Sequence, residues 1–487
     1  MTNAFLRDMS RLYFDHRLFL ACAAAFLLPL KLSWALAVIV PICLLEILSG
    51  FPAMAELLKT PAMYHVKVFV AWCGWAVCSS IFGIDPFNSL HGALSLAFFS
   101  VLIFFTFSVA AQFGPDRILF ALLLGQSIAA MHSILNSAYP GLAPKLFVGK
   151  VTESGQLAIS VVLAIGMLCY LNQKIIRNSG ANGSGLLIFS DLWRISKRKA
   201  LFAFMLLSAL LTAFAAYSDR LAGLRAFFAL LLITALAMNL INLRSIYKRT
   251  AGLDYARVFA ISNIILPLCI TALLANMKRG PWAGAAAGSL ILLCLYSRKL
   301  IAPSLVIAVV LFGTLAPVKE RLEQSAEHFY IHGGRKAIWD IGAELGSHYP
   351  LGIGYENSPV LRDFSTEIPN ELRHFHNNFL NIWVETGWIG LFIFTWWLAV
   401  VIRQAWKDYG PAHYSVLSRG LACCLISWQI AGLVEYNFGD SEVLLVVFLL
   451  LGVLAAIERR GKAATVIRES SVPAFVSAPE RAPAASA

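Results

Sequence analysis

The stretch that decides the fold is Arg373-His374-Phe375-His376-Asn377-Asn378-Phe379-Leu380-Asn381-Ile382-Trp383-Val384-Glu385-Thr386-Gly387-Trp388-Ile389-Gly390. It ends the longest polar interval of an apolar chain and runs directly into an apolar segment of helical length. Asn377, Asn381 and Glu385 are spaced i, i+4, i+8, so they form one polar stripe on a helix. Because lipid cannot satisfy such groups, the stripe is expected to face the protein interior or a wet cavity. His376 is expected at or near the N-terminus of that helix.

The composition predicts an all-α polytopic membrane protein. Of the 487 residues, 59% are hydrophobic and 14% are charged, whereas about a quarter of a soluble domain is charged. The apolar runs are continuous, and many approach the roughly 20 residues that span a bilayer. The net charge of +12 fits basic cytoplasmic loops and anionic lipid, and no recognisable motif predicts nucleic-acid binding.

The positions of lysine and arginine predict the topology. If the basic clusters lie in the cytoplasm, as the positive-inside rule requires, both termini are inside and the chain crosses the membrane about 12–14 times. The outer connections, periplasmic in a Gram-negative cell, are then 217–221, 276–281, 317–378 and 435–440. The predicted domains are N-terminal transmembrane helices over 1–316, a periplasmic loop domain with short helices over 317–378, C-terminal transmembrane helices over 379–460, and a disordered cytoplasmic tail over 461–487.

Three outer connections carry groups that suit an anion: Arg220, Arg279 and His376. Each lies just before a helix that runs inward, and helix N-termini attract anions through their unpaired N–H groups and their dipole. Guanidinium groups can bind phosphate oxygens bidentately, so the two arginines predict a phosphate or pyrophosphate site. A histidine beside such a site can act as a general base on a hydroxyl.

Each of these residues also has a plainer interpretation. An outer arginine often anchors to lipid headgroups, and an interfacial histidine often makes only surface hydrogen bonds. Asn381 and Glu385 are also the kind of residues that hold helices together, and Arg335 could simply cap or solvate a loop helix. Neither DxD, HExxH nor a Walker motif is present, so no metal ion or cofactor is predicted. A donor on the outer side would then be a lipid-linked phosphate.

Several motifs together resemble the O-antigen ligase/polymerase superfamily. His376-Asn377-Asn378-Phe379-Leu380-Asn381 and Glu385-Thr386-Gly387-Trp388-Ile389-Gly390 are similar to its H-N-x-x-L…E-x-G-x-x-G signature. Gly334-Arg335…Trp339 and Pro350-Leu351-Gly352-Ile353-Gly354 resemble its G-R-x-x-x-W and P-x-G-x-G elements. Lys278-Arg279-Gly280 resembles its S-R-G element with Lys in place of Ser, and Glu153-Ser154-Gly155-Gln156-Leu157-Ala158 is a weaker match to an upstream element. The resemblance covers roughly residues 150–400.

The resemblance implies a metal-independent inverting glycosyltransferase of the bacterial inner membrane, with its active site facing the periplasm and no cofactor. Such an enzyme moves a glycan from undecaprenyl pyrophosphate to a lipid A–core sugar hydroxyl if it is a ligase, or to another lipid-linked glycan if it is a polymerase. His376 would be the general base, and Arg279 and Arg220 would hold the pyrophosphate. Arg335, Asn377 and Glu385 are further candidates for substrate binding. A protein O-oligosaccharyltransferase and a lipid or solute transporter remain alternatives, although transporters place ionisable groups near the midplane.

Overall fold

The computed structural model describes residues 2–138, 150–178, 253–296, 334–363, 372–410 and 412–471, with a few isolated positions between these ranges. Every regular element in this described part is helical, which confirms the predicted all-α fold. The predicted runs near 201–216 and 222–242 lie outside the described residues, as does Arg220. Five described helices are long and apolar enough to cross a membrane: α4 (Pro86–Phe113), α5 (Asp116–Ala138), α6 (Lys150–Asn178), α17 (Asn378–Ala405) and α19 (Ser441–Ser471).

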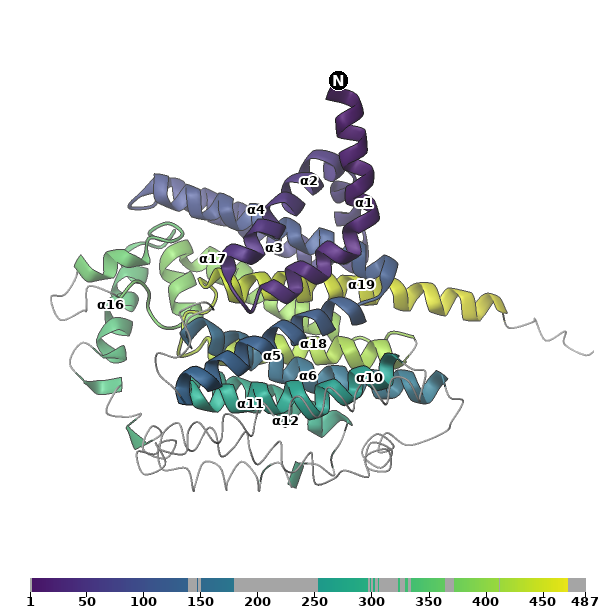
Figure 1. Cartoon of the computed structure of the whole chain (residues 1–487). Helices are drawn as coiled ribbons and strands as arrows, with labels where there is room; N and C mark the ends of the chain where they lie inside the picture. Colours follow the sequence, from purple (N-terminus) through teal and green to yellow (C-terminus); the bar gives the residue numbers. More distant parts are fainter. Residues whose placement is uncertain are drawn as a thin grey trace, which may run out of the picture.

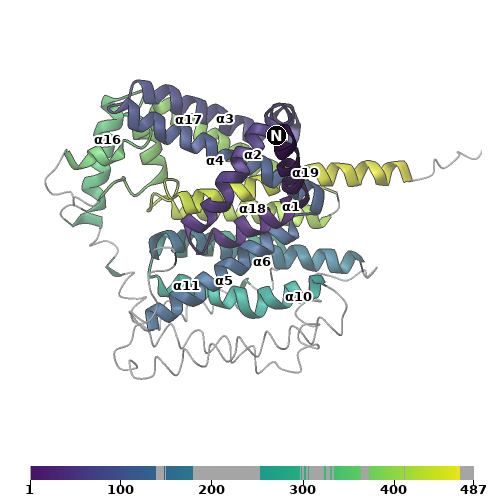
Figure 2. The ribbon, with the colours of Figure 1, turned by 45° about the horizontal axis from the view of Figure 1, so that its top comes forward.

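The helices pack into two groups around a shared centre. Figure 1 shows α5, α6, α11, α12 and α18 side by side. In Figure 2, α3, α4 and α17 lie on one side of α18 and α19, and α5, α10 and α11 lie on the other. The remaining elements are α1 (Thr2–Leu27), α2 (Leu32–Leu58), η1 (Pro61–Met63), α3 (Tyr64–Ile81), α10 (Leu253–Ala260), the π-helix η3 (Ile261–Ile265), α11 (Leu266–Ala275), α12 (Arg279–Tyr296), α16 (Arg335–His348), η5 (Ser358–Asp363) and α18 (Ala412–Ala431).

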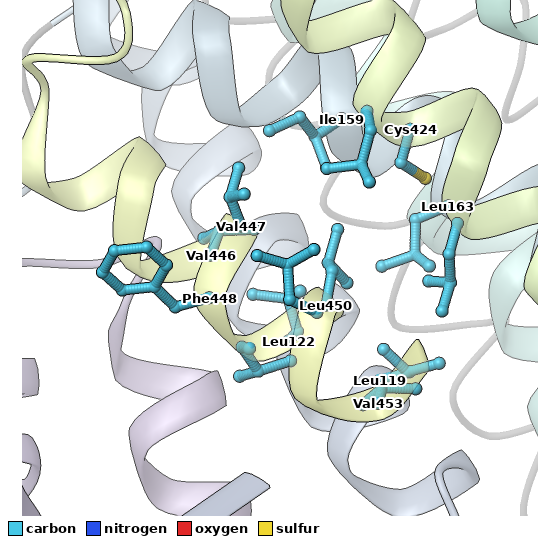
Figure 3. Packing of buried hydrophobic residues seen from close by; sticks show 14 of the residues in the cluster. Leu119, Leu122, Ile159, Leu163, Cys424, Val446, Val447, Phe448, Leu450 and Val453 are labelled. Atoms are coloured by element: carbon cyan, nitrogen blue, oxygen red, sulfur yellow. The ribbon is translucent and has the colours of Figure 1, made fainter. Parts of the chain in front are cut away.

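The central helix of the described bundle is α19. All of its residues from 443 to 458 are buried, as expected for a helix that is apolar on every face. Figure 3 shows Val446, Val447 and Leu450 of α19 packed among side chains of α5, α6 and α18. Lipid tails are as apolar as leucine, so close packing rather than escape from water favours this association.

A row of small residues holds α12 against α18. Gly280, Gly284 and Gly288 recur every four residues and therefore share one face of α12. A Cβ on Gly284 would overlap the carbonyl oxygen of Ser427, and a Cβ on Gly280 would lie 3.1 Å from that of Ala431. The two backbones meet because glycine permits this approach. The contact fixes the N-terminus of α12 beside the C-terminus of α18.

Helices are described both in the long interval 317–378 and in the C-terminal segment. Within 317–378 the structure describes α16 and η5, in agreement with the predicted short helices, and α16 ends at His348. At the other end, α19 continues to Ser471. The helix thus extends past the boundary predicted at residue 460 and into the segment predicted to be a disordered tail.

Candidate active site

The helix that follows His376 is broken at Gly387, where the backbone has φ 69° and ψ −174°. The rings of Phe379 and Phe394 lie on opposite sides of the break, yet their centroids are only 5.9 Å apart. In a straight helix, residues with this separation in sequence would be about 22 Å apart along the axis. The part of α17 before Gly387 therefore runs at a steep angle to the part after it, which the sequence analysis did not predict.

The P-x-G-x-G loop fits into this break. The Gly354 N–H donates to the carbonyl of Glu385 at 2.9 Å, so loop and helix pair through their backbones. A Cβ on Gly352 would overlap the carbonyl oxygen of Glu385, and a Cβ on Gly387 would overlap that of Pro350. Gly352 also has a positive φ of 92°, which side chains disfavour. Two motifs that are separate in the sequence thus form one structural unit.

Two residues of the predicted polar stripe, Asn381 and Glu385, face inward as predicted, whereas Asn377 lies at the N-cap of α17 and is half-buried. Asn381 is 0% exposed and Glu385 is 1% exposed. Ser358 of η5 lies between them, with its Oγ 3.0 Å from Asn381 Oδ1 and its N–H donating to Glu385 Oε1 at 3.3 Å. The hydroxyl of Tyr436 donates to Glu385 Oε2 at 3.4 Å. Glu385 therefore links η5 to α17, and its described side-chain hydrogen bonds do not include one to His376.

Contacts on both sides of Phe375 hold the backbone just before His376. The Phe375 N–H donates to Asn381 Oδ1 at 3.2 Å, and its carbonyl accepts from the indole N–H of Trp339 at 3.0 Å. His376 itself has a φ of 51°, an uncommon value for a residue with a side chain. Its N–H donates to Nδ1 of His374 at 3.3 Å. The surroundings therefore impose the conformation in which His376 is presented.

The two asparagines after His376 attach the start of α17 to the connection between α18 and α19. Asn377 is the N-cap of α17, because its Oδ1 accepts from the N–H groups of Phe379 and Leu380. Its Nδ2 donates to the carbonyl of Leu433 at 3.0 Å. The Asn378 N–H donates to the carbonyl of Gly432 at 2.7 Å, and its Nδ2 donates to Asn437 at 2.8 Å. The amide of Asn377, predicted to bind substrate, is engaged in these structural bonds.

Glu435 of that connection gathers the charged groups of the site. Its Oε2 lies 3.2 Å from Nδ1 of His376, and its Oε1 lies 3.2 Å from Nη2 of Arg335. Burial acts to raise the pKa of Glu435, but the hydrogen bond and charge of His376 and the charges of Arg335 and Lys278 outweigh it. The pKa is therefore below its ordinary value, and the carboxylate is ionised at neutral pH. Glu435 is not among the site residues predicted from the sequence, although it lies in a connection predicted to be outside.

This geometry defines what His376 can do. In the neutral form of His376, the ionised Glu435 accepts from Nδ1–H, so the free lone pair lies on Nε2. The His376 side chain is 25% exposed, so a reacting hydroxyl can reach it. The neighbouring ring of His374 lies edge-on at 4.4 Å, and its pKa is lowered to about 4 by burial and by the charge of His376. His374 is therefore neutral near pH 7 and adds no competing charge.

The N-terminus of α12 lies next to this pair. Arg279 is the first residue of α12, and a Cβ on Gly280 would lie 3.7 Å from Cγ of Glu435. The structure therefore brings the α12 N-terminus, Arg335 and His376 to one end of the bundle, whereas Arg220 lies outside the described residues. Among the residues that are described, no group of three or more His, Cys, Asp or Glu side chains could hold a metal ion.

A comparison with protein families agrees with this arrangement. A family model described as O-antigen ligase matches residues 264–395. The chain resembles the O-antigen ligases. This match confirms the resemblance that the motifs indicated. A search of curated proteins found no match to the chain. The O-antigen ligase family consists of membrane glycosyltransferase-like enzymes that act on lipid-linked glycans in general, and the apolar helices agree with a multi-pass membrane protein. Glu435 lies beyond the matched O-antigen ligase region.

Proposed function

We propose that this protein is an inverting, metal-independent glycosyltransferase at the periplasmic face of the bacterial inner membrane. It transfers a glycan from undecaprenyl pyrophosphate to a sugar hydroxyl of lipid A–core, as an O-antigen ligase does. The observation that supports this proposal is the His376–Glu435 pair, joined by Arg335 and lying beside the N-terminus of α12. A base and several cations at one place suit a reaction in which a hydroxyl displaces an anion.

In the proposed reaction the acceptor hydroxyl loses its proton to Nε2 of His376 while its oxygen attacks the anomeric carbon of the donor sugar. Attack from the face opposite the leaving group breaks the bond between that carbon and the pyrophosphate oxygen, which inverts the configuration. The electron pair of the broken bond leaves with the pyrophosphate. Glu435 stabilises the imidazolium that forms, because its carboxylate already accepts from Nδ1–H.

The leaving pyrophosphate requires positive charge. Arg279 lies at the N-terminus of α12, where the helix dipole and unpaired N–H groups add to the attraction for an anion. Lys278 stands where the family has serine, and its charge is near enough to act on Glu435. Arg335 belongs to the same group through its ion pair with Glu435. We assign these residues to the pyrophosphate, together with Arg220 as the sequence predicts.

Two related activities would use the same chemistry with other acceptors. A repeat-unit polymerase would lengthen an undecaprenyl-linked glycan, and a protein O-oligosaccharyltransferase would modify a side-chain hydroxyl. The motifs and the site geometry are common to all three, so the acceptor must be determined by assay. A transporter is less well supported, because the described charged groups of the site lie at helix ends instead of near a bilayer midplane.

The test is transfer by the purified full-length protein from undecaprenyl-diphosphate glycan to lipid A–core, with EDTA present. Replacing His376 with Ala should abolish the product without preventing membrane insertion, because no other described side chain at the site is placed as the base. The matched control is His348→Ala, which removes an exposed histidine at the end of α16. Equal activity of wild type and His376→Ala would refute the assignment. Lengthened undecaprenyl-linked glycan would instead identify a polymerase.

A further inference from the structure

The first turns of α6 carry polar side chains that are buried inside the bundle. Glu153, Ser154 and Gln156 are all buried there, although α6 is an apolar helix long enough to span a membrane. Buried polar groups in such a helix are costly unless they have hydrogen-bond partners. The partners of Glu153 and Gln156 belong to the two connections that carry the charged groups of the candidate active site.

Asn276 joins the end of α11 to two neighbouring helices. It is the buried C-cap residue of α11 and lies three residues before Arg279. Its Nδ2 donates to Oε2 of Glu153 in α6 at 3.4 Å, and its Oδ1 accepts from the hydroxyl of Ser133 in α5 at 3.1 Å. Both ends of one amide are therefore bound, which fixes the end of α11 relative to α5 and α6.

The backbone after Asn276 makes a sharp turn that requires such support. Met277 has a φ of 54°, a conformation that costs energy for a residue with a side chain and persists only where its surroundings impose it. Across the turn, the indole N–H of Trp282 in the first turn of α12 donates to the carbonyl of Leu273 in α11 at 2.7 Å. Asn276 and Trp282 thus hold the two ends of the turn that carries Arg279.

The same part of α6 contacts the connection that carries Glu435. Nε2 of Gln156 donates to the carbonyl of Glu442 at 3.2 Å, and Glu442 is the second residue of α19. A Cβ on Gly155 would lie 4.0 Å from Cβ of Asn437 in that connection. The start of α6 therefore contacts both the connection with the carboxylate and the turn with the α12 cation, and it sets their relative positions.

We propose that Glu153 and Asn276 are positioning residues for the pyrophosphate, because they hold the turn between α11 and α12 that places Arg279 at a fixed distance from His376. The inference rests on the proposed function, since it takes Arg279 to bind the pyrophosphate. Neither side chain contacts the substrate in this assignment, and each acts through Arg279. A cation on a fixed backbone loses less freedom when it binds than a cation on a loose turn, so loosening the turn weakens binding.

Binding of inorganic pyrophosphate to the purified full-length protein in detergent tests this role without requiring a glycan. Asn276→Ala and Glu153→Ala should each weaken binding by about three- to tenfold, the size expected for one or two lost hydrogen bonds. Glu153→Gln should stay within about twofold of wild type, because its amide oxygen can still accept from Asn276. The matched control is Asn172→Ala, at a buried asparagine near the other end of α6, and it should bind pyrophosphate as wild type does.

A double-mutant cycle with Arg279→Gln separates positioning from a general loss of structure. If Asn276 acts through Arg279, the double variant should bind pyrophosphate within about twofold of Arg279→Gln alone. A general loss of structure would instead add to the loss caused by Arg279→Gln. In transfer assays, Asn276→Ala should raise the KM for the donor and leave the pH dependence of kcat unchanged, because the contacts of His376 with Glu435 are intact.

Wild-type affinity for pyrophosphate in both alanine variants would overturn the proposal, as would wild-type affinity in Arg279→Gln or fully additive losses in the cycle. If Asn276→Ala does not fold, Ser133→Ala removes only the other bond of the same amide, and it should weaken binding while wild-type affinity would overturn the proposal. If wild type binds pyrophosphate with the expected pattern but transfers no glycan, the positioning role stands and the proposed function fails. Glycan transfer by wild type together with unchanged pyrophosphate binding in the variants gives the opposite result.

Discussion

Glu435→Gln removes one negative charge from the site and leaves the size of the side chain almost unchanged. In the wild type, this charge accepts the Nδ1 hydrogen bond of His376 and pairs with Arg335, each at 3.2 Å. The variant can still accept one hydrogen bond from His376, so the tautomer can persist. It can no longer stabilise the imidazolium that forms when His376 takes the proton. We therefore expect the loss to appear in kcat more than in the KM for the donor.

The separation of 3.2 Å sets the size of the effect. At an effective dielectric constant of about 20, two unit charges at this distance attract by about 5 kcal/mol. Solvent screens part of this, because the side chains of His376 and Glu435 are 25% and 16% exposed. Hydrogen bonds to charged groups contribute about 1.5–3 kcal/mol in proteins. The corresponding fall in kcat is about 10- to 150-fold.

The assay is initial-rate transfer to lipid A–core at saturating donor, with Asp440→Asn as the control. Asp440 lies in the same connection and would undergo the same change from carboxylate to amide, but its described side-chain bond is to Thr152 at 3.4 Å. The control should keep kcat within about threefold of wild type, because no described side-chain bond joins Asp440 to His376 or Arg335. Wild-type kcat in Glu435→Gln, or an equal loss in both variants, would refute the role assigned to Glu435.

Three further changes test other parts of the structure. Gly387→Ala places a Cβ against the carbonyl of Pro350 at a φ of 69°, so thermal unfolding should show a loss of about 2–4 kcal/mol, and an unchanged Tm would contradict the fitted break. In the folded protein the pKa of His374 is lowered to about 4, below its ordinary value of 6.5. Between these pH values the unfolded chain binds more protons than the folded protein, so the free energy of unfolding falls as the pH falls. Denaturation curves of His374→Asn should therefore lack up to about 3 kcal/mol of this pH dependence. Arg279→Gln should lower kcat/KM at least about tenfold by removing a charge from the pyrophosphate, whereas normal kinetics would exclude that contact.

The sequence predicted the parts of the site that depend on local spacing. The change from polar to apolar residues predicted a helix beginning close to His376, and the first helical residue is Asn378. The four-residue spacing of Asn381 and Glu385 predicted that both would face inward, and both are buried. These features follow from helical periodicity, which can be read without knowledge of the neighbouring elements.

The parts that could not be predicted depend on contacts between distant segments. Glu435 follows Arg335 by 100 positions, and nothing local in the sequence pairs them. The break at Gly387 is stable because the P-x-G-x-G loop bonds to the exposed backbone of α17, as the bond from Gly354 to Glu385 shows. The available signal for Glu435 was only an acidic residue in a connection predicted to be outside, and Asp440 of the same connection carries the same signal. The meaning of Glu435 became clear only when the fold placed it against His376.

These contacts also show why the matched region cannot form the site alone. The O-antigen ligase match ends at residue 395, before the connection that holds Glu435. Without that connection, His376 and Arg335 lose their shared carboxylate, and the N–H of Asn378 loses its bond to Gly432. The glycine face of α12 likewise requires α18 as its partner. Under the proposed function, the signature residues of the match would therefore provide the base and the cations, and the chain beyond the match would hold them in position.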